Sequence, residues 1–332
     1  YKLPDALEEK IEEIILEETA IPPVKIGGKV GRITTSEMPI FDYIEHLTST
    51  TDLDFSGIRI ALDCAHGSSS ITAPELFMRL GAECMIINAQ PDGVNINREC
   101  GSTHMEQLQK YVVDNKLDVG FAFDGDADRV LAVDSKGNIV DGDKIISICA
   151  KDMKQTGRLT HDTAVVTVMS NMGFYKFCGE NCIKYVTTKV GDRYVLETMV
   201  ENGYKIGGEQ SGHVIFLDYA STGDGQLTAI QLLQVIKRTG KSLQELATCM
   251  EVFPQIMINV KVSKIGKVRF SSDPEVKQAI ERAEAELGND GRVLVRVSGT
   301  EPLVRVMLEG KDKAQITKLG NDIAEVIREK LI

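Results

Sequence analysis

The chain has 332 residues, of which 42% are hydrophobic and 26% charged; these ordinary values exclude disordered, collagen-like and coiled-coil chains and allow two or three domains. The formal net charge of −11 argues against a surface that binds nucleic acid or anionic lipid, and no apolar run reaches the roughly 18 residues of a membrane span. The seven cysteines are odd in number and lack C-x-x-C spacing, which favours thiols in a reducing cytoplasm over a disulfide framework or a zinc site. We therefore expect a cytoplasmic protein without nucleic-acid or membrane partners.

The first predicted element is an amphipathic helix near the N-terminus. Apolar residues recur at spacings of three and four from Leu3 to Ile15, with glutamates between them. The segment 21–23, Ile-Pro-Pro, ends this helix because proline cannot continue it. The chain begins with Tyr1 rather than Met and shows no signal-peptide pattern, so we expect it to be part of a longer protein.

From about residue 57 the sequence alternates between strand and helix patterns, and after residue 143 this alternation starts again. The fold class predicted is α/β, with two consecutive mixed-sheet domains followed, after residue 254, by a small α+β domain. The predicted strands are Ile58–Asp63, Met85–Asn88, Val119–Phe123, Ala164–Met169, Ile183–Thr187, Val214–Leu217, Gln255–Val262, Arg292–Val297 and Leu303–Leu308. The predicted helices lie near Pro74–Leu80, Met105–Lys116, Lys144–Met153, Arg193–Asn202, Gly225–Arg238, Asp273–Leu287 and Asp312–Lys330.

The segment 124–129, Asp-Gly-Asp-Ala-Asp-Arg, follows a predicted strand and is named here the acidic loop. Three carboxylates at alternate positions, in a loop that a glycine allows to turn tightly, can converge on one Mg²⁺. The alternative is a polar β-turn whose aspartates are solvated and bind no metal. An EF-hand is excluded because the twelfth position from Asp124 is Ser135 rather than Glu. We predict Asp124, Asp126 and Asp128 as metal ligands, with Arg129 beside them to hold a phosphate.

The segment 207–213, Gly-Gly-Glu-Gln-Ser-Gly-His, is named the glycine loop and runs into a predicted strand. Its glycines allow close approach to a small polyhydroxylated ligand, and Glu209 and Ser211 can hydrogen-bond sugar hydroxyls. His213 could move a proton, although a single histidine before a strand is usually a hydrogen-bonded bystander. A loop of this composition has a purely structural role about as often as it binds a ligand.

The segment 296–305 is named the arginine hairpin, because a strand ending in Arg-Val-Ser-Gly-Thr leads through Glu-Pro to Arg305. The Ser-Gly-Thr segment offers two hydroxyls and consecutive backbone N–H groups as an anion nest. The guanidinium groups of Arg296 and Arg305 add forked donors that suit phosphate. An ordinary hairpin turn with surface arginines is the competing interpretation. A further cationic loop, Thr188–Arg193, precedes a predicted helix and contains Lys189.

Together, and in this order, the three loops resemble those of the α-D-phosphohexomutase family, and the resemblance covers essentially the whole chain. In that family D-G-D-x-D-R binds the metal, G-E-x-S-G-H contacts the sugar and R-x-S-G-T-E-P binds the phosphate of the substrate. Gln210, where related mannose and glucose enzymes usually carry Met, and the segment 217–225 resemble the branch that converts glucosamine 6-phosphate into glucosamine 1-phosphate. The resemblance thus implies an isomerase in the synthesis of UDP-N-acetylglucosamine and cell-wall precursors.

The resemblance also implies a mechanism in which a phosphoserine donates its phosphoryl group to the sugar, the bisphosphate reorients, and the other phosphate returns to the serine. One Mg²⁺ per active site then offsets the charge that develops on the transferred group. Whether Lys189 or His213 moves the proton is undecided by sequence. The implied roles are metal binding by Asp124, Asp126 and Asp128; catalytic assistance by Arg129, Lys189 and His213; sugar contact by Glu209, Ser211 and His213; and phosphate contact by Arg296, Ser298, Gly299, Thr300 and Arg305.

The chain departs from the family in one respect, since the phosphoserine loop T/S-A-S-H-N-P is absent from it. We therefore expect the chain to be inactive alone, and the complete protein to bind a hexosamine phosphate, with a homodimer as one option. The expected division is a remnant of a first domain and linker at 1–36, an α/β domain with the acidic loop at 37–138, an α/β domain with the glycine loop at 139–250, and an α+β domain with the arginine hairpin at 251–332.

Three alternatives stay open at this point. The chain could be a phosphomannomutase or phosphoglucomutase of the same family. It could be an aspartyl-phosphate phosphatase with Asp124 as the nucleophile, because Asp-x-Asp after an apolar strand imitates that unrelated group. It could also be a non-catalytic module that binds sugar phosphates or metal.

Overall fold

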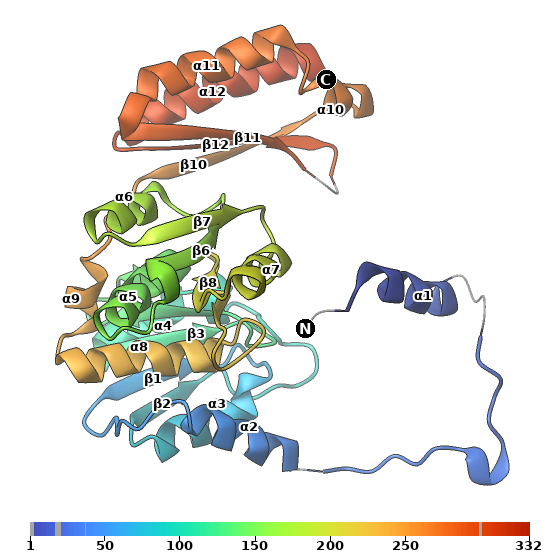
Figure 1. Ribbon diagram of the computed structural model, residues 1–332, viewed down its shortest axis with the longest axis vertical. Helices are drawn as coiled ribbons and strands as arrows, with labels where there is room; N and C mark the ends of the chain where they lie inside the picture. The colour runs from blue at the N-terminus through green and yellow to red at the C-terminus, as the bar shows by residue number, and fades with distance from the viewer. Residues whose placement is uncertain (1–2, 17–20, 37, 299–300) are drawn as a thin grey trace. The chain divides into compact units, whose positions relative to one another are not determined.

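The structure, a computed structural model, describes residues 3–16, 21–36, 38–298 and 301–332. The chain divides into two compact units (Figure 1), of which unit 1 comprises Tyr1–Val168 and Val186–Ala247, and unit 2 comprises Met169–Tyr185 and Thr248–Ile332. Each unit is described by itself. The predicted N-terminal helix is confirmed as α1, Asp5–Ile15, and a 3₁₀ turn, η1, follows at Gly27–Lys29.

The first sheet of unit 1 has five strands in the order β2-β1-β3-β4-β5. Strands β1 and β2, and β1 and β3, are parallel, whereas β3–β4 and β4–β5 are antiparallel, so the predicted mixed sheet is confirmed. Because β1 and β3 are parallel neighbours, the loops that follow them leave the same edge of the sheet. The strands are β1 Arg59–Asp63, β2 Glu83–Ile87, β3 Val119–Phe123, β4 Val130–Asp134 and β5 Ile139–Val140; the helices around them are α2 Met38–Thr48, α3 Ser69–Arg79, η2 Gly101–Thr103 and α4 Glu106–Asp114.

The second sheet has four strands in the order β7-β6-β8-β9, with β6 parallel to β8 and β8 antiparallel to β9. Strand β6 is buried along its whole length, as expected for a strand covered on both faces. The strands are β6 Thr163–Thr167, β7 Lys184–Thr188, β8 Ile206–Gly208 and β9 Val214–Phe216; the associated helices are α5 Gly142–Gln155, η3 Thr160–Asp162, α7 Asp192–Asn202, α8 Gly225–Thr239 and α9 Leu243–Ala247. Helix α6, Met172–Glu180, belongs to unit 2.

Helix α8 joins the two sheets of unit 1. Its first twelve residues, from Gly225 to Ile236, are all buried, and it contacts β3 and β4 of the first sheet as well as β9 of the second. A helix that is buried on every side belongs in the core, since it has no face to offer to water. Two sequence-consecutive α/β segments therefore pack as one unit.

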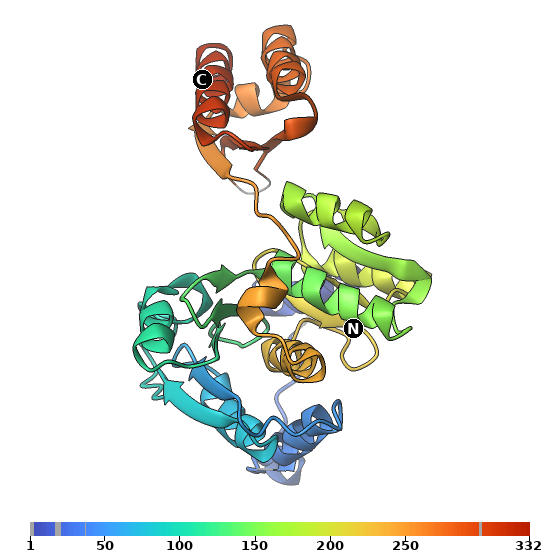
Figure 2. The ribbon, with the colours of Figure 1, turned by 90° about the vertical axis from the view of Figure 1, so that its left-hand side faces the viewer.

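Unit 2 contains a three-stranded antiparallel sheet in the order β10-β12-β11. Helices α11 and α12 cover one face of this sheet (Figure 2), and their buried aliphatic residues form one core with those of β10 and β12. The predicted small α+β domain is thus confirmed. Its elements are β10 Gln255–Lys261, α10 Lys264–Arg269, α11 Pro274–Leu287, η4 Gly288–Asp290, β11 Gly291–Val297, β12 Leu303–Gly310 and α12 Lys313–Leu331.

Some elements of the structure were not predicted, chiefly α2, β4, α6 and β8. Helix α6 has two glycines and three aromatic residues among nine, and strand β8 is Ile-Gly-Gly, so both have weak intrinsic propensity and depend on packing. Helix α3 begins at Ser69, earlier than the predicted Pro74, and carries that proline inside it. Among the described residues, no helix is long and apolar enough to cross a membrane.

A hydrogen bond from Tyr43 on α2 to Asp224, which precedes α8, fixes these two helices in unit 1. The Tyr43 hydroxyl donates to Asp224 Oδ2 at 2.9 Å, while Asp224 Oδ1 accepts from the backbone N–H of Leu227 at 2.9 Å. Burial raises the pKa of Asp224 above its ordinary value, and the hydrogen bonds oppose that rise. Replacing Tyr43 by Phe should lower the free energy of unfolding by about 1–2 kcal/mol at pH 8.

The loss of unfolding free energy in Tyr43→Phe should depend on pH, because Asp224 titrates. Without the Tyr43 hydroxyl the folded-state pKa of Asp224 rises further, and a raised pKa contributes stability that is lost as pH rises through it. Urea unfolding should therefore show a larger loss for Tyr43→Phe at pH 8 than at pH 5. The matched control is Tyr111→Phe, because the Tyr111 hydroxyl makes a weak contact with the sulfur of Met85, at 3.9 Å. Equal losses at both pH values would contradict the expectation.

Candidate functional site

The acidic loop is the turn of the β3–β4 hairpin, in which Phe123 pairs with Val130. Strand β3 is fully buried and delivers Asp124 to the edge of the first sheet, where its side chain is also buried. The loop is supported at this edge, since the N–H of Ser68 donates to the carbonyl of Gly125 at 2.9 Å and the N–H of Gly225 donates to that of Ala127 at 2.9 Å. Neighbouring segments of unit 1 thus hold the loop in one conformation.

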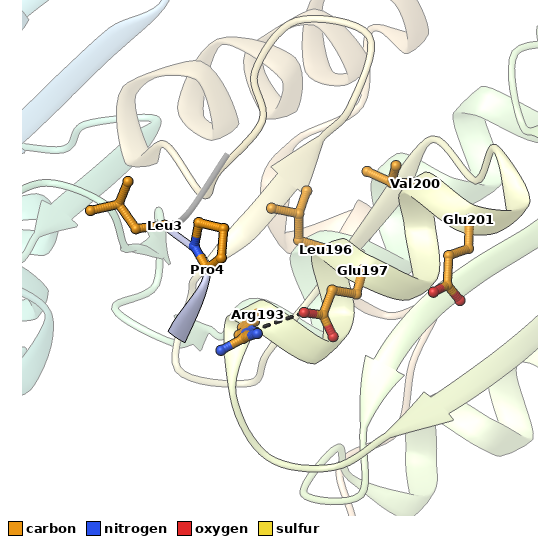
Figure 3. Close-up of a pocket in the computed structure, with 7 residues that line it drawn as sticks. All are labelled: Leu3, Pro4, Arg193, Leu196, Glu197, Val200 and Glu201. Atoms are coloured by element: carbon orange, nitrogen blue, oxygen red, sulfur yellow. Dashed lines mark hydrogen bonds and ion pairs between the residues drawn. The ribbon is translucent and has the colours of Figure 1, made fainter. Parts of the chain in front are cut away.

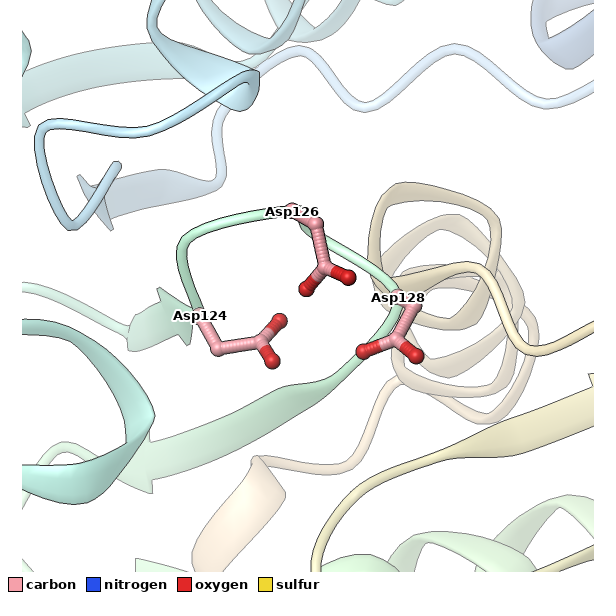
Figure 4. Close-up of side chains that lie close together, drawn as sticks. All are labelled: Asp124, Asp126 and Asp128. Carbon is pink, nitrogen blue, oxygen red and sulfur yellow. The ribbon is translucent and has the colours of Figure 1, made fainter. Parts of the chain in front are cut away.

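The three predicted metal ligands point toward one another (Figure 4), and one carboxylate oxygen from each lies within 4.8 Å of the other two. Asp124 is 2% exposed, Asp126 is exposed, and Asp128 lies between these extremes. Arg129 Nε donates to Asp124 Oδ2 at 2.7 Å and lies 3.4 Å from Asp128 Oδ1. The predicted position of Arg129 beside the carboxylates is therefore seen in the structure.

Burial raises the pKa of the Asp124 carboxyl to about 6, although hydrogen bonds and the charge of Arg129 act in the opposite direction. The neighbouring charges of Asp128 and Asp126 raise it further. Three carboxylates held this close without a divalent cation repel one another, and one guanidinium does not neutralise them. Convergent hard oxygen ligands with open space for water or phosphate oxygens fit Mg²⁺.

The glycine loop connects β8 to β9, and its backbone is hydrogen-bonded to the residue that directly follows the acidic loop. The N–H of Val130 donates to the carbonyl of Gly212 at 3.2 Å. Gly212 has φ +95°, and a Cβ there would lie 2.3 Å from the Val130 carbonyl oxygen, so only glycine allows this approach. The structure therefore brings together two loops that lie about 80 residues apart in the sequence.

Glu209 links the glycine loop to the cationic loop at 188–193. Its Oε1 accepts a hydrogen bond from the backbone N–H of Gly191 at 3.2 Å. Ser211 and Lys189 are exposed, and the Lys189 ammonium lies 5.9 Å from the centre of the Tyr194 ring. The side chains of Ser211 and Lys189 are therefore accessible to a ligand.

Gln210 has a structural contact that the sequence did not reveal. Its amide donates to Asp141 Oδ2 at 3.3 Å, and Asp141 is the N-cap of α5, where Oδ1 accepts from the N–H of Lys144 at 3.0 Å. A methionine at this position could not donate such a hydrogen bond. Gln210 thus connects the glycine loop to the N-terminus of α5.

His213 is 4% exposed and lies between the acidic loop and the segment 222–224. Its Nδ1 is 3.1 Å from Asp128 Oδ2, and its Nε2 accepts the backbone N–H of Gly223 at 3.0 Å. The contribution of Gly223 was missed by reasoning from sequence, although the Thr-Gly-Asp-Gly run at 222–225 is a recognisable loop signal.

A pocket of about 350 Å³ opens beside the acidic loop in unit 1. Its lining is rich in hydroxyl and carboxylate groups, which suits a hydrated cation or a hydroxylated ligand. The residues that line it are Tyr43, Ser68, Thr72, Asp126, Ala127, Asp128, Thr222, Gly223, Asp224 and Gln226.

Another hollow of about 350 Å³ lies away from the acidic loop and contains none of the predicted site residues (Figure 3). It is formed by Leu3 and Pro4 near the N-terminus and by one side of α7, where Arg193 pairs with Glu197 at 2.8 Å.

In unit 2 the arginine hairpin is formed by β11 and β12, and Arg296 faces Arg305 directly across the two strands. Burial and the like charge of Arg305 lower the pKa of Arg296. Arg305 donates to Glu301 at 3.2 Å, and among the residues that the structure describes its buried Nε has no hydrogen-bond partner. Ser298 is 4% exposed and its hydroxyl accepts the N–H of Glu301 at 3.2 Å. The predicted Gly299 and Thr300 lie outside the described residues.

Comparison with family profiles matches three consecutive parts of the chain. Residues 41–137 match phosphoglucomutase/phosphomannomutase alpha/beta/alpha domain II, residues 141–253 match domain III, and residues 257–326 match the C-terminal domain.

Curated relatives match the whole chain. It is 54% identical over 331 residues to the phosphoglucosamine mutase of Caldanaerobacter subterraneus subsp. tengcongensis and 52% identical to that of Acetivibrio thermocellus. In both comparisons the match covers 100% of this chain and 74% of the relative, so the chain spans about three quarters of the length of these proteins.

Solved structures share the fold at low sequence identity. A phosphoglucomutase/phosphomannomutase family protein from Burkholderia thailandensis superposes with a TM-score of 0.78 at 21% identity, covering 99% of this chain and 71% of that one. An N-acetylphosphoglucosamine mutase from Aspergillus fumigatus, in complex with GlcNAc-6P and magnesium, superposes with a TM-score of 0.73 at 20% identity, covering 87% and 66% respectively.

Proposed function

The chain belongs to the phosphoglucomutase/phosphomannomutase family of isomerases, and on that premise we propose that it acts on glucosamine 6-phosphate, as a phosphoglucosamine mutase does. The observation that carries this proposal is the hairpin turn in which one oxygen from each of three carboxylates lies within 4.8 Å of the other two, beside Arg129. Such a cluster fits the charge of a phosphoryl-transfer site. Identity of 51–54% to curated phosphoglucosamine mutases over 99–100% of the chain supports the glucosamine assignment over mannose or glucose.

We assign the metal site to Asp124, Asp126 and Asp128, which would hold one Mg²⁺. When bound, this ion supplies positive charge that offsets the charge on the transferred phosphoryl oxygens. Arg129, held against Asp124 and Asp128, is placed to contact those oxygens as well. Family membership also weighs against an aspartyl-phosphate mechanism in which Asp124 is the nucleophile.

The sugar is assigned to the glycine loop. Ser211 is exposed, and Glu209 is oriented by the N–H of Gly191 at 3.2 Å, so both can bind hydroxyl groups of the ring. Lys189, exposed on the neighbouring loop, is our candidate for charge stabilisation and for the proton transfer.

A phosphate group of the substrate is assigned to the arginine hairpin. Two guanidinium groups on directly opposed strand positions repel each other, and an anion between them removes that repulsion. The Nε of Arg305, for which the described part of the chain offers no hydrogen-bond partner, supplies a donor for such an anion. Ser298 adds a buried hydroxyl, and Gly299 and Thr300 complete the proposed set from outside the described residues.

The four-part domain division at 1–36, 37–138, 139–250 and 251–332 stays part of the proposal, and the family matches at 41–137, 141–253 and 257–326 support it. A cytoplasmic location is likewise proposed, on the pattern of the seven cysteines.

Calorimetry tests the proposed function on the chain itself. Glucosamine 6-phosphate should bind in the presence of Mg²⁺, and more tightly than glucose 6-phosphate or mannose 6-phosphate. Arg296→Gln should weaken this binding about tenfold or more, since one charge-assisted phosphate contact is lost. Arg282→Gln, an exposed change on α11, is the matched control.

Equal binding of the three sugar phosphates would favour the mannose or glucose alternatives. Binding that Arg296→Gln does not affect would contradict the assignment of the phosphate to the arginine hairpin.

A further inference from the structure

We infer that strand β10 forms a further side of the phosphate site in unit 2, and that Asn259 and Lys261 on this strand bind the phosphate group of the substrate. This inference rests on the proposed function, which assigns a phosphate to the arginine hairpin of β11 and β12. It adds a third strand to that site.

The side chains of β10 and β12 that concern the site lie on the face of the sheet opposite to the helices. Successive side chains of a strand point to opposite faces of its sheet. Val260 on β10 and Val304 on β12 belong to the core that α11 and α12 cover (Figure 2). Their neighbours in sequence, Asn259, Lys261 and Arg305, therefore lie on the other face.

The register of the three strands places these residues next to one another. Asn259 pairs with Arg305, and Arg305 pairs with Arg296 on its other side. Side chains directly opposite on antiparallel strands have Cβ atoms about 4.5–5.5 Å apart, and diagonal neighbours are about 7–8 Å apart. Lys261 pairs with Leu303 and is thus a diagonal neighbour of Arg305, a separation that the length of a lysine side chain can span. Both β10 residues therefore lie within reach of an anion bound at Arg305.

Both side chains are also available to a ligand. Asn259 and Lys261 are exposed, and within the described part of the chain neither side chain has a hydrogen-bond or ion-pair partner. Lys261 adds a third positive charge to those of Arg296 and Arg305, whereas the carboxylate that pairs with Arg305, that of Glu301, is 56% exposed. An ammonium group and an amide N–H group are both suitable donors to phosphate oxygens.

The other end of the same face differs, because its charges have partners within unit 2. Two rows further along this face, Glu309 pairs with Arg292 and accepts its Nε at 2.7 Å, and it also accepts the backbone N–H of Met172 at 3.2 Å. The row of Arg305 has an excess of positive charge instead, and an anion compensates that excess.

Two substitutions test the two side chains separately. Lys261→Gln removes one positive charge and keeps a polar side chain. Asn259→Asp keeps the size of the side chain, but it replaces the donor with a carboxylate that repels an anion bound at Arg305. The controls are Lys277→Gln on α11 and Asn321→Asp on α12, which make the same charge changes at exposed positions on the helices that cover the opposite face.

Calorimetry with glucosamine 6-phosphate, glucose 6-phosphate and mannose 6-phosphate, each with Mg²⁺, measures the effect. We expect Lys261→Gln to weaken the binding of all three about three- to tenfold and Asn259→Asp about tenfold or more, because the phosphate is common to them. The loss for Lys261→Gln should shrink as the NaCl concentration is raised, since salt screens an exposed charge. Thermal unfolding without ligand should give equal melting temperatures for Asn259→Asp and the unmodified chain, because the new carboxylate lies opposite a guanidinium.

A loss of binding no larger than that of its control, in either variant, would overturn the inference. Equal binding of the three sugar phosphates by the unmodified chain, together with the expected losses in the variants, would contradict the glucosamine assignment and support the inference. Failure of the unmodified chain to bind any of the three would contradict both.

Discussion

Asp124→Asn is expected to reduce the Mg²⁺ affinity of this chain by about 100-fold or more, the largest effect of any single substitution on metal binding. Asp124 is the most buried of the three carboxylates and is presented by a fully buried strand, so no alternative side chain can replace it. The amide that replaces it is a neutral ligand and a weak one for a hard divalent cation.

A thermal-shift experiment measures this effect without activity. A ligand that binds only the folded state raises its stability in proportion to the logarithm of the ligand concentration over its dissociation constant. Mg²⁺ should therefore raise the melting temperature of the unmodified chain, EDTA should reverse the rise, and Asp124→Asn should show neither. Asp114→Asn, which removes a 56% exposed carboxylate on α4, should keep the full Mg²⁺ response. A preserved Mg²⁺ shift in Asp124→Asn would refute the assignment of the metal site.

Glu309→Ala is expected to destabilise unit 2 by about 3–5 kcal/mol, the largest effect on stability among our predictions. Glu309 is fully buried and accepts Arg292 Nε at 2.7 Å, the backbone N–H of Met172 at 3.2 Å and the Asn171 amide at 3.2 Å. Burial raises the pKa of the Glu309 carboxyl, whereas the positive charge of Arg292 and its hydrogen bond act in the opposite direction. Removing it takes away the carboxylate that accepts from Arg292 Nε and from the backbone N–H of Met172.

The control for this prediction is an ion pair of the same unit at the surface. Glu251→Ala breaks the Lys176–Glu251 pair, in which the side chains are 48% and 65% exposed, and such pairs contribute at most about 1 kcal/mol. Urea unfolding, followed by hydrogen exchange in β11 and β12, should separate the two variants clearly. Similar small losses in both would show that Glu309 does not carry the buried network.

The two loops with the most distinctive chemistry could be read from the sequence because their residues are contiguous. Three aspartates at alternate positions after an apolar strand predict a carboxylate cluster from local geometry alone, and the structure places their oxygens within 4.8 Å. The arginine hairpin follows similarly from two strand patterns separated by a turn, and register then places Arg296 opposite Arg305. In both cases the relevant contacts are local in the chain.

Other parts of the site depend on contacts between segments that are distant in sequence. The role of His213 depends on Asp128 and Gly223, which come from different hairpins and loops, and the role of Gln210 depends on Asp141. Neither the hydrophobic periodicity of the sequence nor the spacing of its motifs indicates such contacts. The sequence consequently left two candidates, Lys189 and His213, for the proton transfer.

The sequence by itself determined the type and order of most elements, though not of α2, β4, α6 and β8, and it determined the chemistry of the loops, because hydrophobic periodicity and turn residues act over a few positions. Only the tertiary structure decided which segments pack together. Helix α8 is buried because two sheets meet on it, and the segment Met169–Tyr185 belongs to unit 2 through the contacts of Glu309 and Arg292 with its backbone. Burial and long-range hydrogen bonds are properties of the folded chain, and they bring His213 into contact with Asp128 and Gly223, which lie far from each other in the sequence.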